Sequence, residues 1–285
     1  MKTAILNISI GNYFRFWEKF YESSKANFLP DTEKTYFIFT DKPKSEIKDS
    51  PDIIYIYQEN LGWPFNTMKR FAMFERIKDQ LREFDYIFFI NGNALFTEKL
   101  NIKFIKENKD LITVQHPGFY RKAITEVPFE RNPESNAYIP VGNGKFYIQG
   151  AFIGGKAAPF LDMVAELNRL TEEDLSKNIV AVWHDESFIN KYIVGRENVQ
   201  VLGPQYLGYE EYVHPYKAPI ILRNKRKNLD LNSFRNISKK ENVSILKIKM
   251  FLRNLKERLL IILGIRRRLY WKSSDNSYID NDINS

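Results

Sequence analysis

A tryptophan, a histidine and two carboxylic acids stand side by side in the run Trp183-His184-Asp185-Glu186-Ser187. The pattern that follows predicts a helix over 183–192 that opens near Asp185. Backbone N–H groups and the helix dipole favour negative charge at such an N-terminus. A carboxylate placed there can face a sugar ring, as a nucleophile or as a stabiliser of an oxocarbenium-like centre. The pattern alone is equally compatible with helix capping by Asp185 and a tryptophan in the core.

A second candidate is the run Asn91-Gly92-Asn93, which directly follows the strongly apolar segment 84–90. Ligands of α/β sheets bind beyond the carboxyl ends of the strands, so this position suits a site. Two carboxylates there could hold a divalent cation on a diphosphate. Asparagine offers a cation only a neutral carbonyl oxygen, although its amide can donate to a phosphate or ribose oxygen. Because Asn-Gly is also a turn sequence, the run by itself favours a plain strand-end turn.

The elements that must position these residues alternate in type along the chain. Short apolar runs predict strands over 4–10, 35–40, 52–57 and 84–90, and helical spacing predicts helices over 13–28, 67–82, 161–170 and 183–192. This order predicts an α/β fold with a mostly parallel sheet and helices on both faces. Residues 116–155 are rich in proline and glycine and are predicted to be loops. They begin at His116, one of three histidines, and an isolated histidine is more often structural than reactive.

The composition is that of a globular protein with a substantial core. The 285 residues are 44% apolar and 27% charged. An aromatic content of 15% favours a phenylalanine-rich core and is compatible with stacking on sugars. The absence of cysteine excludes disulfides, thiolate catalysis and cysteine-bound zinc. No signal-peptide pattern and no run of about 18 apolar residues is found, so a cytoplasmic location is expected.

The net charge of +8 belongs to the C-terminal part of the chain. Residues 238–272 contain 11 Lys or Arg and 2 Glu, a net charge of +9, which leaves −1 for the rest. Nucleic acid is therefore not an expected partner. Within this part, apolar residues over 245–263 form a helical stripe with basic residues beside it. The pattern is typical of a helix that lies peripherally on a membrane, and equally of a terminal helix packed on its own domain or on a partner subunit.

Several blocks resemble, in the same order, family 6 of the retaining glycosyltransferases, the family of the blood-group A and B enzymes. They are Trp63 with Met68-Lys69-Arg70, and residues 85–96, 116–120, 129–140, 146–155, 181–192, 201–207 and 221–223. The resemblance covers about residues 4–227, and its most specific block is Trp183-His184-Asp185-Glu186-Ser187. It implies a GT-A-type, Rossmann-like mixed sheet flanked by helices in one catalytic domain, 1–230, followed by a basic amphipathic helical tail, 231–285. The donor UDP would bind to about 1–100, and the acceptor to about 101–230.

The resemblance also implies roles for individual residues. Glu186 matches the carboxylate nearest the reacting carbon and an acceptor contact, and His116 and Trp183 match further acceptor contacts. The positions matched to donor contacts are Ile8, Ser9, Ile10 and Tyr13 for uracil and ribose, Arg70, Asn91, Asn93 and Asp185, and Gln149, Gly150 and Ala151. Basic residues at the end of the core (Arg223, Lys225, Arg226 and Lys227) could fold over the diphosphate.

Three departures from the blood-group enzymes shape the expected function. Family members that need a metal have Asp-X-Asp, whereas some bacterial members resemble this chain in having Asn-X-Asn and work without one. We therefore predict no metal and no cofactor, with charge supplied by Lys and Arg. Pro128 replaces a threonine near the acceptor. The bulk of Gln149 and the methyl group of Ala151 favour galactose as the donor sugar, whereas Gly118 points to N-acetylgalactosamine.

The resemblance thus implies transfer of galactose, or N-acetylgalactosamine, from its UDP-sugar in α1,3 linkage with retention. The acceptor would be a galactosyl glycan, plain or fucosylated. A different hypothesis is a catalytically inactive protein that binds sugar nucleotides or glycans, which the missing aspartates suggest. A third is an adaptor that works through the basic tail. The presence of Arg70, His116, Asp185 and Glu186 favours the enzyme.

Overall fold

The computed structural model describes residues 1–228 and, beyond them, 252, 255, 256, 258, 259, 262, 263, 269–272 and 277–280. The chain divides into two compact units. Unit 1 consists of Met1–Phe14, Thr32–Gly92 and Ile105–Pro204, and unit 2 of Arg15–Asp31, Asn93–Phe104 and Gln205–Ser285. Each unit is therefore assembled from separate stretches of sequence.

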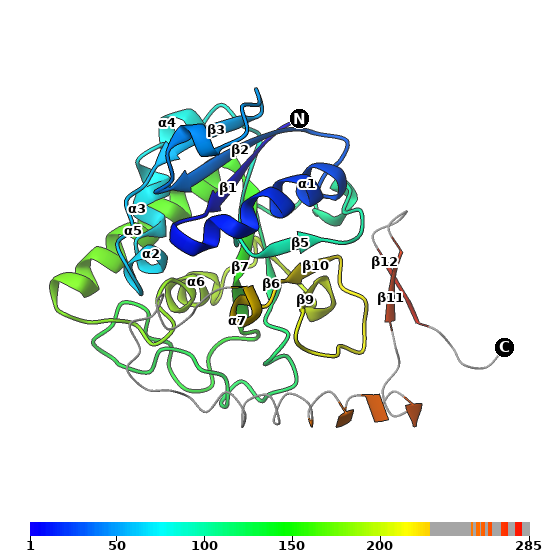
Figure 1. Ribbon diagram of the computed structural model, residues 1–285. Coiled ribbons are helices and arrows are strands. Elements are labelled where there is room, and N and C mark those ends of the chain that lie inside the picture. Colours follow the sequence, from blue (N-terminus) through cyan, green and yellow to red (C-terminus); the bar gives the residue numbers. More distant parts are fainter. Residues whose placement is uncertain are drawn as a thin grey trace. The chain divides into compact units, whose positions relative to one another are not determined.

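Unit 1 is built on a seven-stranded mixed sheet, which confirms the predicted α/β class (Figure 1). In spatial order its strands are β3 (Ile53–Tyr57), β2 (Glu33–Thr40), β1 (Lys2–Ile8), β4 (Tyr86–Ile90), β7 (Ile148–Lys156), β6 (Leu111–Gln115) and β8 (Val199–Leu202). All neighbouring strands are parallel except β7, which runs antiparallel to β4 and β6. The central strands are buried on both faces, and for this reason they appear in the sequence as unbroken apolar runs.

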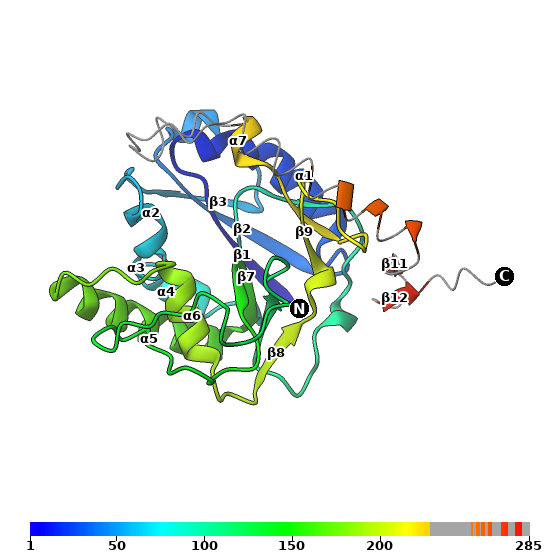
Figure 2. The ribbon, with the colours of Figure 1, turned by 90° about the horizontal axis from the view of Figure 1, so that it is seen from below.

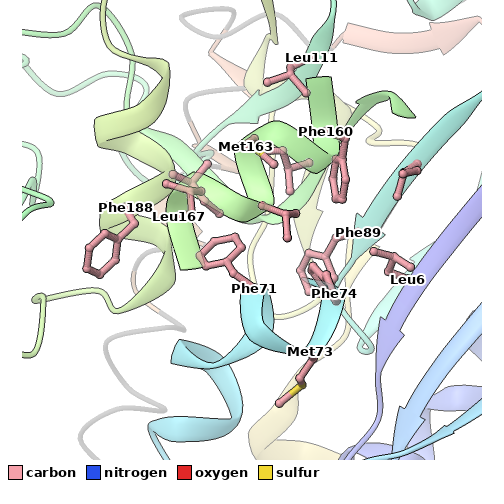
Figure 3. Packing of buried hydrophobic residues seen from close by; sticks show 14 of the residues in the cluster. Leu6, Phe71, Met73, Phe74, Phe89, Leu111, Phe160, Met163, Leu167 and Phe188 are labelled. Atoms are coloured by element: carbon pink, nitrogen blue, oxygen red, sulfur yellow. The ribbon is translucent and has the colours of Figure 1, made fainter. Parts of the chain in front are cut away.

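The main core of unit 1 packs the sheet against helices that share one face. α3 (Arg70–Glu75), α5 (Ala157–Ser176) and α6 (Asp185–Ile193) lie together there (Figures 1 and 2). Phe71, Phe74 and Phe160 meet Phe89 of β4 in a cluster that includes Leu167 and Phe188 (Figure 3). Each such side chain stabilises the fold by roughly 1.5–3 kcal/mol. The catalytic candidates of α6 and Asn91, which directly follows β4, are thus positioned by one core.

Two glycines of β7 allow this strand to fit between its neighbours. A Cβ atom on Gly154 would lie 2.1 Å from the Phe88 ring, and one on Gly155 would lie 2.1 Å from the carbonyl oxygen of Asp110. Gly155 also has a φ of +151°, which side-chain-bearing residues rarely adopt. Any side chain at either position would push β7 away from β4 or β6.

Unit 2 contains a small three-stranded sheet and α1 (Trp17–Asn27). Its strands are β5 (Ala94–Phe96), β10 (Ile220–Leu222) and β9 (Leu207–Tyr209), with β10 antiparallel to β5 and parallel to β9. The remaining short elements of the chain are η2 (Lys44–Glu46), η3 (Ile102–Phe104), η4 (Pro204–Tyr206), α7 (Lys225–Asn228), β11 (Leu269–Lys272) and β12 (Ser277–Asp280).

The structure corrects two predicted helices. The helix expected over 13–28 is a 3-10 helix, η1 (Gly11–Phe16), followed by α1, and the one expected over 67–82 is three pieces, α2 (Phe65–Met68), α3 and α4 (Lys78–Leu81). The breaks fall at Lys69 and Ile77, whose ψ angles are +11° and +16°. Apolar spacing shows which side chains are buried, but it does not register such local changes of ψ.

Two other boundaries differ as well. β7 occupies the end of the segment predicted as loops, because its glycines conceal a strand that close packing requires. α5 extends beyond the predicted 161–170 on both sides.

Most of the predicted tail helix over 245–263 lies outside the described residues. Within it, Leu252, Leu255, Lys256, Arg258, Leu259 and Ile262 have helical backbone. The peripheral membrane contact therefore stays a prediction. No helix among the described residues is long and apolar enough to cross a membrane.

Candidate active site

The start of α6 presents its two carboxylates through a strained turn. His184 precedes the helix with φ +54° and ψ −126°, a conformation that costs a non-glycine residue on the order of 1–3 kcal/mol. The turn is held by hydrogen bonds, among them one from the Val182 N–H to Glu130 Oε2 at 2.7 Å. Trp183 is 49% exposed, so it is not the core tryptophan that the sequence pattern also allowed. Backbone strain next to two acids marks this turn as a candidate reactive site.

Asp185 is engaged in a buried ion pair. Its Oδ2 lies 2.9 Å from Nη1 of Arg70, and both side chains are almost fully buried. The same Nη1 donates to the carbonyl oxygen of Gly150 at 2.8 Å, and the guanidinium lies 4.1 Å from the centroid of the Phe89 ring. Burial lowers the pKa of Arg70, and the charges of Asp185 and Glu186 oppose that shift. The pair joins α3, α6 and β7 at one point.

Glu186 is held by two neutral donors. The Tyr147 hydroxyl donates to Oε1 at 2.7 Å, and the Gly150 N–H donates to Oε2 at 2.8 Å. The pKa of Glu186 is raised to about 7, chiefly by burial and also by the charge of Asp185, whereas Gly150, Tyr147 and Arg70 act in the opposite direction. Two adjacent acids therefore have different surroundings: Asp185 meets a guanidinium, and Glu186 can gain or lose its proton near neutrality. Such division of roles is characteristic of catalytic carboxylate pairs.

Gly150 permits the close approach of β7 to both acids. A Cβ atom there would lie 3.2 Å from Glu186 Cβ and 3.4 Å from Asp185 Oδ2. Gln149 and Ala151, the predicted determinants of donor choice, flank this glycine. The carbonyl of Ala151 accepts the Asn91 N–H at 2.8 Å, so β7 connects the acids with the end of β4.

The predicted uridine residues of unit 1 lie around the same strand end. Ile8 ends β1, Ser9 and Ile10 follow it, and Tyr13 lies in η1; Ser9, Ile10 and Tyr13 are buried. A Cβ atom on Gly92 would lie 3.0 Å from the Ile8 carbonyl oxygen and 3.4 Å from both Ser9 Oγ and Tyr13 Cδ1. The structure thus brings together the β1 end, Asn91-Gly92, β7 and the start of α6.

Asn93 belongs to unit 2 and is engaged with backbone. Its Nδ2 donates to the carbonyl oxygen of Arg223 at 2.7 Å, and its own carbonyl accepts the Arg223 N–H at 2.8 Å. Its Oδ1 is buried without a hydrogen-bond partner among the residues that the structure describes. This pairing could not be predicted, because nothing local in the sequence connects two positions that are 130 residues apart. The described residues contain no cluster of three or more His, Cys, Asp or Glu that could hold a metal ion.

His116 is fixed as a neutral hydrogen-bond donor. Its Nδ1 accepts the Gly118 N–H at 2.9 Å, which places the ring proton on Nε2. Burial lowers the pKa of His116 to about 4. A Cβ atom on Gly118 would lie 3.0 Å from the ring, so glycine at this position leaves room for the His116 side chain. The ring packs on Phe119 and Tyr147.

Sequence reasoning missed two polar residues that support the site. Tyr147, which lies inside a resemblance block, bonds Glu186. Glu130 accepts the N–H groups of Asn132 and Val182 at 2.7 Å each, and it is only 7% exposed. Glu130 follows three apolar residues, Val127, Pro128 and Phe129, but nothing else in the sequence indicated its role. Trp63 is also nearby: its ring lies edge-on to His184 at 5.3 Å.

Comparisons with known proteins identify the family of this chain. The family model described as Glycosyltransferase family 6 matches residues 3–236. The O-antigen biosynthesis glycosyltransferase WbnI of Escherichia coli is 34% identical over 227 residues, which is 80% of this chain and 96% of that protein.

Vertebrate proteins match over a smaller share of their length. Histo-blood group ABO system transferase 2 of Rattus norvegicus is 28% identical over 70% of this chain and 61% of its own. Globoside alpha-1,3-N-acetylgalactosaminyltransferase 1 of Homo sapiens is 26% identical over 75% of this chain and 62% of its own. With a family model that matches most of its length and a relative that is 34% identical over 80% of it, the chain belongs to glycosyltransferase family 6 and is a hexosyltransferase.

Proposed function

We propose that this enzyme transfers galactose from UDP-galactose, or N-acetylgalactosamine from the corresponding donor, to a galactosyl acceptor that is plain or fucosylated. The new bond is α1,3, the anomeric configuration is retained, and no metal ion takes part. The observation that carries the proposal is the Glu186 carboxylate, held by Tyr147 and Gly150 beside the Arg70–Asp185 pair. The names of relatives that act on O-antigen, blood-group and globoside glycans support the same class of acceptor.

Glu186 stabilises positive charge at the anomeric carbon of the donor sugar. The bond between this carbon and the diphosphate oxygen breaks, UDP leaves with the electron pair, and O3 of the acceptor forms the new bond. The acceptor proton passes to an oxygen of the departing diphosphate. Retention requires either a covalent adduct on Glu186 or departure and attack on one face through an ion pair. Both routes need an ionised Glu186, so activity should rise with pH through about 7.

Asp185 and Arg70 orient the donor sugar in this proposal. The ion pair leaves little freedom to either side chain, because Arg70 is also bonded to Gly150 and stacked on Phe89. His116 donates from Nε2 to an acceptor hydroxyl and stays neutral at all pH values above about 4. These side chains are held in place by their contacts and position both substrates. Such positioning contributes to catalysis because it lowers the entropy cost of reaching the transition state.

Metal-free transfer is supported by the chemistry of the Asn-X-Asn motif. Two amide oxygens are poor ligands for a hard divalent cation, and the Asn93 amide already donates to the Arg223 carbonyl. These residues do not fit the Mn²⁺ or Mg²⁺ site that carboxylates would form. Lys and Arg side chains and N–H donors then compensate the charge of the departing diphosphate.

The test is a panel of UDP-sugars with plain and fucosylated galactosides, with EDTA or Mn²⁺, followed by analysis of the linkage. We expect an α1,3-linked product whose rate of formation EDTA leaves unchanged. Strict dependence on Mn²⁺ would overturn the metal-free mechanism. UDP binding without any product across the panel would favour the inactive binding protein. A chain that ends before Ser238 should keep its turnover, whereas an adaptor that acts through the tail would lose its function.

A further inference from the structure

We propose that Tyr147 is a positioning residue that holds the Glu186 carboxylate in the orientation required for transfer. It also couples this carboxylate to residues 116–120, here called the His116 loop. The inference rests on the proposed function of Glu186. Tyr147 contacts both His116, a predicted acceptor residue, and Glu186, the predicted catalytic residue.

The phenol hydroxyl supplies one of two fixed points for the carboxylate. It donates to Oε1 of Glu186 at 2.7 Å, while the N–H of Gly150, three residues further along the same segment, donates to Oε2 at 2.8 Å. One donor on each oxygen fixes both the rotation and the tilt of the carboxylate plane. The Gly150 donor is part of the backbone of β7, and only proline, which would also disturb the strand, could remove it, so Tyr147 is the part of the pair that substitution can test.

The ring of Tyr147 is fixed by apolar packing. The residue is 3% exposed and belongs to a cluster with Val127, Phe129 and Ile139. The Phe129 ring lies 5.3 Å from it, and Phe119 packs edge-on at 5.2 Å. A phenylalanine would fill the same space equally well, so packing alone does not account for the hydroxyl, whereas Glu186 does.

The backbone of Tyr147 connects this ring to the acceptor side. Its carbonyl accepts the His116 N–H at 2.8 Å, and its ring lies 5.7 Å from the imidazole. Movement of the His116 loop would therefore be transmitted to the hydroxyl on Glu186. An acceptor that orders this loop on binding would also fix the orientation of the Glu186 carboxylate. Acceptor binding would then control whether this carboxylate is correctly placed for transfer.

The effect of the Tyr147 hydroxyl on the ionisation of Glu186 depends on the other charged and titratable groups that face this carboxylate. Asp185 on α6 disfavours its ionisation, Arg70 on α3 favours it, and the His116 ring beyond Tyr147 is neutral near pH 7. A donor bonded to the ionised form lowers a carboxyl pKa, and Tyr147 acts in this direction on Glu186. Loss of the hydroxyl should therefore make Glu186 harder to ionise and leave it less well oriented.

The experiment compares Tyr147→Phe with Tyr192→Phe, which removes a hydroxyl from the same helix as Glu186 but away from it. We expect the acid limb of the kcat profile of Tyr147→Phe to move up by about one pH unit, a tenfold change in ionisation constant. Turnover at pH 7 should fall about fivefold, because the ionised fraction of Glu186 drops from about one half to about one tenth, and it should recover largely above pH 9, while the KM for the UDP-sugar changes little. Tyr192→Phe should keep the wild-type profile. An unchanged acid limb in Tyr147→Phe, with only a lower thermal midpoint, would overturn the proposal.

A double variant separates this inference from the assignment of Glu186. If Tyr147 acts through Glu186, then Tyr147→Phe should have almost no further effect on turnover in a Glu186→Gln background. Independent, multiplicative losses would overturn the coupling. If Glu186→Gln alone retains near-normal turnover, then the proposed function of Glu186 fails. If that variant is strongly impaired but the acid limb of Tyr147→Phe does not move, only the role of Tyr147 fails.

Discussion

Two regions of this molecule use buried polar side chains in opposite ways. Around Glu186 in unit 1, charged groups are buried together: the Glu186 carboxyl group, whose pKa is raised to about 7, faces the Arg70 cation and the Asp185 carboxylate. At Asn93 in unit 2, a neutral amide bonds the backbone of Arg223 and joins two strands. The first arrangement retains capacity to react, whereas the second uses its donor to fix the fold. The Asn-X-Asn motif therefore combines an asparagine beside the candidate site with one that serves as a structural joint.

The largest expected effect that separates the regions is on turnover. Glu186→Gln should lower kcat by about a thousandfold or more, because the stabilising charge at the reacting centre is lost. The dissociation constant for UDP should change only a few-fold. Steady-state kinetics and calorimetric titration with UDP measure the two quantities. Glu166→Gln, which removes a partly exposed acid of α5 that is paired with Arg196, is the control. Near-normal turnover of Glu186→Gln would refute the role of this residue.

The second expected effect is on stability within unit 1. Arg70→Met should lower the free energy of unfolding by about 3–5 kcal/mol, because it leaves the buried Asp185 carboxylate without its cation. The exposed pair Arg82–Asp79 provides a control, and Arg82→Met should cost at most about 0.5 kcal/mol. Urea unfolding followed by circular dichroism measures both. Equal, small losses would show that the Arg70–Asp185 pair is much less buried in solution.

The third effect sharpens the distinction between the two asparagines. Asn93→Asp should destabilise the protein by about 1–3 kcal/mol, because a carboxylate cannot donate to the Arg223 carbonyl and would be buried facing it. Asn91→Asp should cost less than about 0.5 kcal/mol, since the residue is only partly buried. Thermal unfolding of the two variants, with and without Mn²⁺, makes the comparison. Equal losses, or a gain of stability with Mn²⁺ in Asn93→Asp alone, would contradict a structural role for Asn93.

The fourth effect is a pH dependence of stability. The folded-state pKa of Glu186, about 7, lies above its unfolded value of 4.5. The folded protein therefore binds the extra proton between these values, and the corresponding stability is lost as the pH rises through about 7. Glu186→Gln does not titrate, so its thermal midpoint should rise relative to that of the wild type between pH 5 and pH 8. A constant difference across this range would indicate that Glu186 is already ionised at pH 5.

Much of the framework could be predicted from the sequence, because burial leaves a one-dimensional trace. The strand before Asn91 was visible as an unbroken apolar run, and the start of α6 at Asp185 followed from its acids. β7 was not visible, because the glycines that let it pack closely are also typical of loops. The roles of Asn93 and Tyr147 depend on partners 130 and 39 residues away. A single sequence records the residue types but does not show which distant residues come into contact.

The fit of β7 against Glu186 has a consequence for how the donor preference of such an enzyme can change over time. Position 150 accepts only glycine without displacing the acids, whereas its neighbours at 149 and 151 carry side chains on the other face of the strand. In the proposed function, substitutions at 149 and 151 can therefore alter the choice of donor sugar without disturbing the two acids, whereas a side chain at 150 would disturb them. Choice of sugar and reactivity are then separated by a single peptide unit.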